Sequence, residues 1–332
     1  MKFEQIDKNK KLIAGIGSAL IDILVHENDE FLEKTGAVKG GMKYVDKAFI
    51  EETLSHTTQT PIIVPGGSAC NTVVGVGKLG GPARFVGKSG CGDMARLFET
   101  DLKKNNVEPF LFKSSSPTGR VLSIITRDAQ RSMFTFLGAS SETQPHEITE
   151  KCFKDASIVH IEGYLLFNED LILAALKAAK SAGALISLDL ASFTVVEASN
   201  LILKDIVKDF VDILLANEDE ARAFTGYSDD IKAITALTQD TTIAALKVGK
   251  RGSYISYRGK IIKIEPVGDG KILDTTGAGD LWASGFLFGL VNGYSFKKCG
   301  KLASACGYEV ARVIGANIPE AGWQRIKMIL EE

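Results

Sequence analysis

The most informative stretch of this chain is Asp274-Thr275-Thr276-Gly277-Ala278-Gly279-Asp280, which comes directly before an apolar run at residues 281–291. The run is typical of a buried helix, so we expect residues 277–280 to form its first turn. Backbone N–H groups are unpaired there, and small residues let an anion approach them. An acid among these donors could accept the proton of a hydroxyl that attacks a phosphoryl group. A glycine-rich turn with Asp280 as a helix cap would have the same composition.

The composition is that of an ordinary globular protein. The 332 residues are 45% hydrophobic and 24% charged, enough for one large α/β domain and unlike a disordered chain. The formal net charge of −2 predicts no nucleic-acid partner, and no apolar run is long enough to predict a membrane span. The five cysteines form no C-x-x-C pair, so we expect reduced thiols and a cytoplasmic chain.

Short β-rich runs alternate with helical patterns along most of the chain. Crossover connections of this kind predict an α/β fold with a mostly parallel sheet and helices on both faces. The expected strands are 12–17, 62–64, 84–87, 158–162, 185–189, 213–216, 244–248 and 252–257. The expected helices include 170–182, 231–238 and 299–313.

Two stretches depart from this alternation, at residues 22–48 and 107–138. The second reads as three short strands joined by polar turns. The strands are expected near 110–113, 120–126 and 132–137, and the turns at 114–118 and 127–130. We expect both stretches to form a small antiparallel sheet that projects from a single domain of residues 1–332. Such a sheet could act as a lid that excludes water from a phosphoryl-transfer site.

Two glycine motifs point to other kinds of nucleotide site. Residues 75–80 match G-x-G-x-x-G, but they fall inside an expected helix and not between a strand and a helix, which argues against an NAD site. Residues 87–89 resemble the end of a Walker A loop. The leading glycine of that loop would fall at Pro82, which has no N–H to donate to phosphate.

Polar and glycine residues also follow two of the early strands. Asp22 comes where the chain is expected to leave the sheet, and it could hold substrate hydroxyls or simply cap a helix or loop. Gly66 and Gly67 expose backbone at the carboxyl end of a strand, where α/β sheets bind ligands. Asn71 follows one helical turn later and could bind vicinal hydroxyls.

A further polar pair, Asn217 and Glu220, comes at another strand end. Residues three apart share a helix face, so this pair could position water bound to Mg²⁺. Acidic residues are also common at helix starts that bind no ligand. Both interpretations stay open at this point.

These four motifs, taken in chain order and spacing, resemble the ribokinase-like family of carbohydrate and nucleoside kinases. The resemblance extends from about residue 12 to residue 320. Residues 41–46, 130–133 and 162–165 are similar to the bacterial adenosine kinase branch of the family. The resemblance implies a three-layer α/β/α sandwich with a small β lid. It also implies ATP and Mg²⁺ as cofactors, and K⁺ as in some relatives.

The resemblance assigns a role to each motif. Asp280 would be the general base, and the backbone of Gly277, Ala278, Gly279 and Asp280 would form an anion hole. The substrate would be bound by Asp22, Gly66, Gly67, Asn71, Leu20, Tyr164 and Arg131. The ATP site would include Asn217, Glu220, Lys247, Gly249 and Gly252, with Glu220 also organising Mg²⁺ through water. Asp274 and Thr276 could bind K⁺.

The resemblance leaves the acceptor open. We expect transfer to the 5′-hydroxyl of adenosine or a close analogue, a purine-salvage reaction; the alternative is a free sugar or sugar acid, as for fructokinase or ribokinase. The alternative from another class of protein is a non-catalytic regulator that binds a nucleoside or a nucleotide. Lys247 departs from the family pattern, because relatives often carry Thr there. We expect a monomer or homodimer with no nucleic-acid or membrane partner.

Overall fold

The structure, a computed structural model, describes residues 1, 3, 6–7, 9–37, 39–128 and 130–331. Its strands are hydrogen-bonded in the order β13-β12-β11-β10-β9-β8-β1-β5-β6-β2-β4, with β7 joined to β6 and β3 to β7. The strands are β1 (Leu12–Ile16), β2 (Leu20–His26), β3 (Met42–Tyr44), β4 (Ile62–Gly66), β5 (Ala83–Cys91), β6 (Val107–Ile125), β7 (Arg131–Gly138), β8 (Ala156–Glu162), β9 (Leu185–Asp189), β10 (Ile213–Asn217), β11 (Ile243–Lys247), β12 (Ser253–Tyr257) and β13 (Lys260–Ile264).

Helices connect most of these strands. The α-helices are α1 (Asp29–Lys34), α2 (Lys47–His56), α3 (Ser68–Lys78), α4 (Asp93–Lys104), α5 (Glu169–Ser181), α6 (Phe193–Phe210), α7 (Glu218–Thr225), α8 (Asp230–Leu237), α9 (Ala278–Val291), α10 (Phe296–Ala311) and α11 (Glu320–Glu331). The short 3₁₀ helices are η1 (Ala139–Glu142), η2 (Pro145–Glu147), η3 (Glu150–Phe153), η4 (Gly163–Phe167) and η5 (Gly249–Arg251). Over the residues that the structure describes, no helix is long and apolar enough to cross a membrane.

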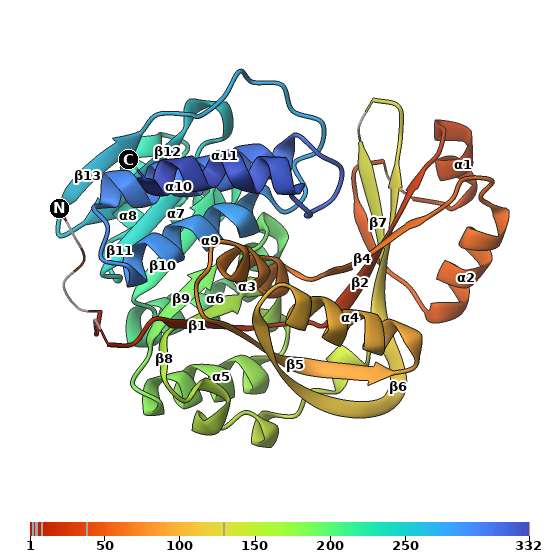
Figure 1. Ribbon diagram of the computed structural model, residues 1–332, viewed down its shortest axis with the longest axis horizontal. Coiled ribbons are helices and arrows are strands. Elements are labelled where there is room, and N and C mark those ends of the chain that lie inside the picture. The colour runs from red at the N-terminus through yellow and green to blue at the C-terminus, as the bar shows by residue number, and fades with distance from the viewer. Residues whose placement is uncertain (2, 4–5, 8, 38, 129, 332) are drawn as a thin grey trace.

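The main sheet is parallel from β5 through β1, β8, β9 and β10 to β11, and β12 and β13 extend it in antiparallel orientation. Successive strand residues face opposite sides. Ile213 and Leu215 therefore join the core beneath α3, α9 and α10, while Leu214 and Ala216 join the core beneath α5, α6 and α8. The predicted α/β/α sandwich is confirmed (Figure 1).

Helix α9 is the central helix on one face of the sheet, and all its residues from Leu281 to Val291 are buried. It packs between α3 and α10. At the crossing with α3, a Cβ added to Gly75 would lie 2.5 Å from Ser284 Oγ, so glycine is needed for this close approach. Gly75 and Gly77 of the G-x-G-x-x-G match therefore serve packing inside α3, and Gly80 follows the end of this helix with φ +88°, so the match does not lie between a strand and a helix.

The lid sheet contains β4, β2, the second half of β6, β7 and β3. In Figure 1 the lid strands β2, β4 and β7, with α1 and α2, lie at the right, away from β8–β13. One expectation from the sequence is wrong here, because β4 belongs to the lid, where it pairs antiparallel with β2. Asp22 lies past β1, where the chain leaves the main sheet, but inside strand β2, so it caps neither a helix nor a loop.

The predicted turn at residues 114–118 is also wrong, because β6 runs unbroken from Val107 to Ile125. Its first half pairs with β5 in the main sheet, and its second half pairs with β2 and β7 in the lid. Pro117 lies where the strand passes between the two sheets, at a register shift in the β5 pairing. A missing N–H is tolerated at such an irregularity, so serine and proline here mark a change of partner and not a reversal of the chain.

Candidate active site

The amino end of α9 begins as the sequence predicts. Its N-cap is Gly277, which has φ +72° and no side chain that could accept a hydrogen bond from the first turn. A Cβ at this position would lie 2.6 Å from the Cβ of Ala316, so both the backbone angle and the neighbouring loop favour glycine. No capping side chain covers the first turn, and its N–H groups can face an anion.

Asp280 lies in this first turn and is held by side chains of α3. Its two carboxylate oxygens accept hydrogen bonds from Ser68 Oγ at 2.7 Å and from Asn71 Nδ2 at 2.9 Å. Thr72 donates to the backbone oxygen of Asp280 at 3.1 Å. Burial raises the pKa of Asp280 to about 6, although the bonds from Asn71 and Ser68 oppose the increase. The carboxylate is therefore oriented and is a stronger base than an exposed aspartate.

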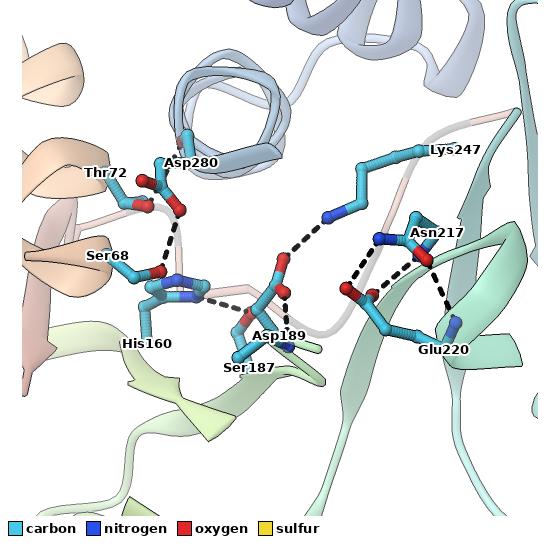
Figure 2. Close-up of polar contacts among 10 residues, drawn as sticks. Ser68, Thr72, His160, Ser187, Asp189, Asn217, Glu220, Lys247 and Asp280 are labelled. Atoms are coloured by element: carbon cyan, nitrogen blue, oxygen red, sulfur yellow. Dashed lines mark hydrogen bonds and ion pairs between the residues drawn. The ribbon is translucent and has the colours of Figure 1, made fainter. Parts of the chain in front are cut away.

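Ser68 is a contact that the sequence reasoning missed, although its signal was present. Ser68, Asn71 and Thr72 are spaced so that they share one face of α3. That face meets α9, as Figure 2 shows for Ser68, Thr72 and Asp280. Asn71, expected to bind substrate hydroxyls, here donates to Asp280.

Strand β8 ends in a buried acid, Glu162, that lies beside this site. It accepts hydrogen bonds from the backbone N–H of Ser18 at 2.8 Å and of Ala69 at 3.0 Å. Burial raises the pKa of Glu162 to about 7. Because Ser18 leads into lid strand β2 and Ala69 lies in the first turn of α3, Glu162 ties the base of the lid to the helix that holds Asp280.

A buried ion pair occupies the carboxyl ends of β9 and β11. Lys247 Nζ lies 2.7 Å from Asp189 Oδ2, and the other oxygen of Asp189 accepts the Ala191 N–H at 2.9 Å. Burial alone would favour the neutral lysine, but Asp189 and Glu220 raise the pKa of Lys247 above its ordinary value. Asp189 had no assigned role in the sequence reasoning. Its signal was a carboxylate at the last position of an expected buried strand.

Asn217 and Glu220 form a capping box at the start of α7. Asn217 donates its N–H to Glu220 Oε2 at 2.7 Å and its Nδ2 to Oε1 at 2.6 Å, while Glu220 N–H donates to Asn217 Oδ1 at 2.9 Å. Burial, with Asp189 nearby, raises the pKa of Glu220 to about 7. Asn217 and Glu220 therefore cap the start of α7, which is the interpretation that requires no ligand. Each carboxylate oxygen has a further lone pair for bound water.

The lid reaches the glycine-rich motif through Arg131 on β7. The guanidinium of Arg131 donates a hydrogen bond from Nε to Ser123 Oγ at 2.9 Å. A second nitrogen of the same group donates to the hydroxyl of Thr276. The Arg131 guanidinium also lies 4.0 Å from Asp22 Oδ2. Burial raises the pKa of Asp22, and Arg131 opposes that shift. Three expected site residues are thus brought together where the lid meets the main domain.

The expected K⁺ ligands are engaged with each other. Asp274 Oδ1 accepts from the N–H of Thr276 at 2.9 Å and from its hydroxyl at 2.7 Å, and Asp274 Oδ2 accepts from the N–H of Gly315 at 2.8 Å. In the described part of the chain, no group of three or more His, Cys, Asp or Glu residues could hold a metal ion. K⁺ binding stays a prediction.

The remaining expected residues lie at the borders of the site. Leu20 begins β2, and Gly67 is the N-cap of α3. Gly249 begins η5 and Gly252 follows it, both with positive φ, directly after the strand that carries Lys247. Tyr164 lies in η4; burial raises its pKa, and the charges of Asp280 and Glu162 raise it further.

A second tyrosine, Tyr44, lies on lid strand β3; burial raises its pKa, and the charge of Glu162 raises it further. It is half exposed. Tyr44 lies within residues 41–46, which resemble the adenosine kinase branch, and the sequence alone assigns it no role. Tyr44 belongs to the lid and Tyr164 to the main domain.

Comparisons with known proteins identify the family of the chain. The model of the pfkB family of carbohydrate kinases matches residues 30–321. Among solved structures, a probable sugar kinase from Rhizobium etli is 30% identical with a TM-score of 0.88, and the match covers 96% of this chain and 98% of that one. Adenosine kinase from Sinorhizobium meliloti is 29% identical with a TM-score of 0.87, covering 96% and 99%.

Curated relatives include both sugar and nucleoside kinases. Probable fructokinase-7 of Arabidopsis thaliana is 29% identical over 272 residues, 73% of this chain and 77% of the relative. The nucleoside kinase of Methanocaldococcus jannaschii is 27% identical over 277 residues, 80% and 85% of the two chains. The chain belongs to the pfkB family of carbohydrate kinases, and it is an ATP-dependent phosphotransferase that uses Mg²⁺ and acts on an alcohol group of a sugar or nucleoside.

Proposed function

We propose that this kinase phosphorylates the 5′-hydroxyl of a nucleoside, with adenosine as the first candidate acceptor. The observation that carries the reaction is the placement of Asp280. It is oriented by Ser68 and Asn71 in the first turn of an uncapped helix, directly beside the loop that the lid contacts. A base and an anion hole in one turn are what phosphoryl transfer to a hydroxyl requires.

One feature supports a nucleoside over a smaller acceptor. Tyr44 on the lid and Tyr164 in the main domain carry aromatic rings, and rings of this kind stack against a planar base. The Sinorhizobium meliloti adenosine kinase and the Rhizobium etli probable sugar kinase match this chain equally well, so the two structures do not choose between the acceptors. With a nucleoside as acceptor, Asp22 and the Gly66–Gly67 backbone would bind the ribose hydroxyls.

In the proposed mechanism, Asp280 accepts the proton of the attacking hydroxyl. With a pKa of about 6, it is ionised at neutral pH and still basic enough to assist proton transfer. Ser68 and Asn71 hold its two oxygens, so its remaining lone pairs have fixed directions. The N–H groups of Gly279 and Asp280 donate to the phosphoryl oxygens as negative charge develops on them. Arg131 closes the lid and excludes water.

The described residues fit ATP with Mg²⁺ held largely by phosphates and water. No all-protein cage is present among them, which suits a metal that keeps several waters. Asn217 and Glu220 would hold one of these waters with the lone pairs that the capping box leaves free. Mg²⁺ supplies charge neutralisation at the phosphates when it is bound. Asp274 and Thr276 are the proposed K⁺ ligands.

A free sugar is the second candidate acceptor. Several curated relatives are fructokinases, and the ribokinase of Arabidopsis thaliana is 26% identical over 326 residues. The same base and anion hole would serve a primary hydroxyl of a sugar. The two tyrosines would then have no base to contact.

The test is release of ADP with Mg·ATP over a panel of adenosine, inosine, cytidine, ribose and fructose, with Asp280→Asn as the inactive control. We expect turnover on adenosine that the variant loses. Turnover on ribose or fructose alone would overturn the nucleoside proposal and keep the reaction. No turnover by folded protein on a wider panel of nucleosides and sugars would favour a non-catalytic binding protein.

A further inference from the structure

The buried pair of Lys247 and Asp189 lies beside the anion hole and has no part in the mechanism above. A Cβ built on Gly279 would lie 3.2 Å from Lys247 Nζ, so the ammonium is next to the first turn of α9. In Figure 2, Lys247 extends between Asp280 on one side and the Asn217–Glu220 pair on the other, and points at Asp189. An anion bound at this helix end would meet the ammonium directly.

Lys247 Nζ has more N–H donors than hydrogen-bond partners in the described structure. An ammonium group carries three N–H donors. Within the described chain, the structure gives Nζ one hydrogen-bond partner, Asp189. The side chain of Lys247 is only 13% exposed, so bulk water does not readily satisfy the other two donors. The ammonium group therefore keeps two N–H donors for a ligand, next to the helix turn where the sequence motif predicts a phosphate.

Asp189 is itself fixed in place. Its Oδ1 accepts the N–H of Ala191, a non-glycine residue held at φ +62°. A left-handed backbone costs free energy, and strain of this kind concentrates at functional sites. The strained turn directs an N–H at one oxygen of Asp189, and the other oxygen is left for Lys247.

Stability alone is a poor reason to keep this pair. Burying two charges costs about as much as their attraction returns, and an apolar or small polar pair of similar volume would pack as well. A full positive charge at this buried position, supported by a buried carboxylate, indicates a use that requires the charge.

We propose that Lys247 is a further catalytic residue that donates to the transferring phosphoryl group, and that Asp189 is the positioning residue that aims it. The inference rests on the proposed kinase reaction and deepens it. In the transfer, the acceptor oxygen bonds to the γ-phosphorus while the bond from that phosphorus to the bridging oxygen of ADP breaks. ADP leaves with the bonding electrons, the hydroxyl proton goes to Asp280, and Lys247 keeps its own proton.

The test compares Lys247→Met, Lys247→Arg, Asp189→Asn and the double variant Lys247→Met/Asp189→Asn. We expect Lys247→Met to lower kcat about 100-fold, the size of effect for one lost donor to the transition state, with KM for the acceptor little changed. Lys247→Arg should recover at least about tenfold of that loss because it restores a charged donor. Asp189→Asn should lower kcat by about tenfold, since the ammonium stays but loses its direction.

The double variant separates catalysis from folding. It leaves no unpaired buried charge, so it should fold even where a single variant does not. If Asp189 acts only through Lys247, the double variant is as slow as Lys247→Met. A double variant that regains more than a third of the wild-type kcat would show that the pair is structural and would overturn the inference.

Binding provides a second readout that does not depend on the acceptor. By isothermal titration calorimetry, the double variant should bind adenosine 5′-(β,γ-imido)triphosphate with Mg²⁺ about tenfold more weakly than wild type, and AMP equally well. Equal affinity for the triphosphate would overturn the role of Lys247 and leave the kinase function intact. If wild type neither binds the triphosphate nor releases ADP on the panel, the proposed function itself fails, and the inference with it.

Discussion

Helices α7 and α9 both begin at the carboxyl edge of the sheet, and each carries an acid at its third position, Glu220 in α7 and Asp280 in α9. Burial raises the pKa of both carboxyls, to about 7 and about 6. The two helices share the position and the burial of this acid, and they differ in the N-cap residue that precedes the helix. Their first turns do different things.

In α7 the acid closes its own helix end, because Glu220 bonds the N–H and Nδ2 of its N-cap, Asn217. In α9 the N-cap is a glycine without a side chain, and Asp280 is bonded by Ser68 and Asn71 of another helix. The first turn of α9 is therefore left open for an anion. The same acid at the same helical position is a cap in one place and a candidate base in the other, and the partner residues decide which.

The largest expected effect comes from Asp280→Asn. Asparagine keeps the shape but cannot take up the proton, so kcat should fall by about 10³-fold while acceptor binding stays near normal. Steady-state kinetics with the acceptor identified by the panel provide the measurement. Retention of more than a tenth of the activity, by a variant with unchanged circular dichroism, would show that Asp280 is not the base.

Closing the open helix end should have the next largest effect. Gly277→Ala imposes a Cβ at φ +72° and 2.6 Å from Ala316 Cβ, so it should destabilise the fold by about 1–3 kcal/mol and shift the anion hole. We expect kcat to fall by about tenfold or more. Urea unfolding and kinetics measure the two effects.

The matched control is Gly226→Ala at the C-cap of α7. Gly226 has φ +80°, and a Cβ there meets no atom within 4 Å. This variant should lose about 1 kcal/mol of stability from the backbone angle alone and keep its kcat. If both variants lost activity equally, the anion hole would not explain the effect of Gly277.

A smaller effect on the rate is expected from Glu220→Gln, at the capped first turn of α7. Glutamine has one acceptor oxygen, so it can keep the bond from the Asn217 N–H but sets its NH₂ group against Asn217 Nδ2, and the melting temperature should fall by about 2–4 °C. Glutamine binds a Mg²⁺-coordinated water less well than a carboxylate, and the Mg²⁺ concentration for half-maximal rate should rise about tenfold. A magnesium titration of the initial rate checks this. An unchanged magnesium requirement would leave Glu220 as a helix cap only.

The smallest effect is the pH dependence near neutrality. The active form of Asp280 is the carboxylate, and its pKa is raised to about 6, so kcat should be constant above this value and fall as pH decreases through it. The Glu220→Gln variant should show the same decrease of kcat at low pH, because it removes the acid of α7 and leaves the base Asp280 in α9. If the decrease of kcat at low pH disappeared in Glu220→Gln, the titrating group would be Glu220 in α7 and not Asp280 in α9.

Much of the fold could be predicted from the sequence. Expected strands at 158–162, 185–189 and 213–216 agree with β8, β9 and β10 within a few residues, because buried parallel strands are short apolar runs between turn signals. The glycines at 277 and 279 likewise predict where α9 begins. The lid was harder, since β6 serves two sheets and its polar middle resembles a turn.

The sequence by itself determined the local elements and the chemistry available at their ends, because hydrophobic period and helix-start composition act over a few neighbouring residues. It identified Asp280, but not the partners Ser68 and Asn71, which lie more than 200 positions earlier in the chain. Only the tertiary structure decided that Lys247 pairs with Asp189, which lies 58 positions away. Contacts between strand ends depend on strand order in the sheet, and strand order is fixed by packing of the whole core and not by any local pattern.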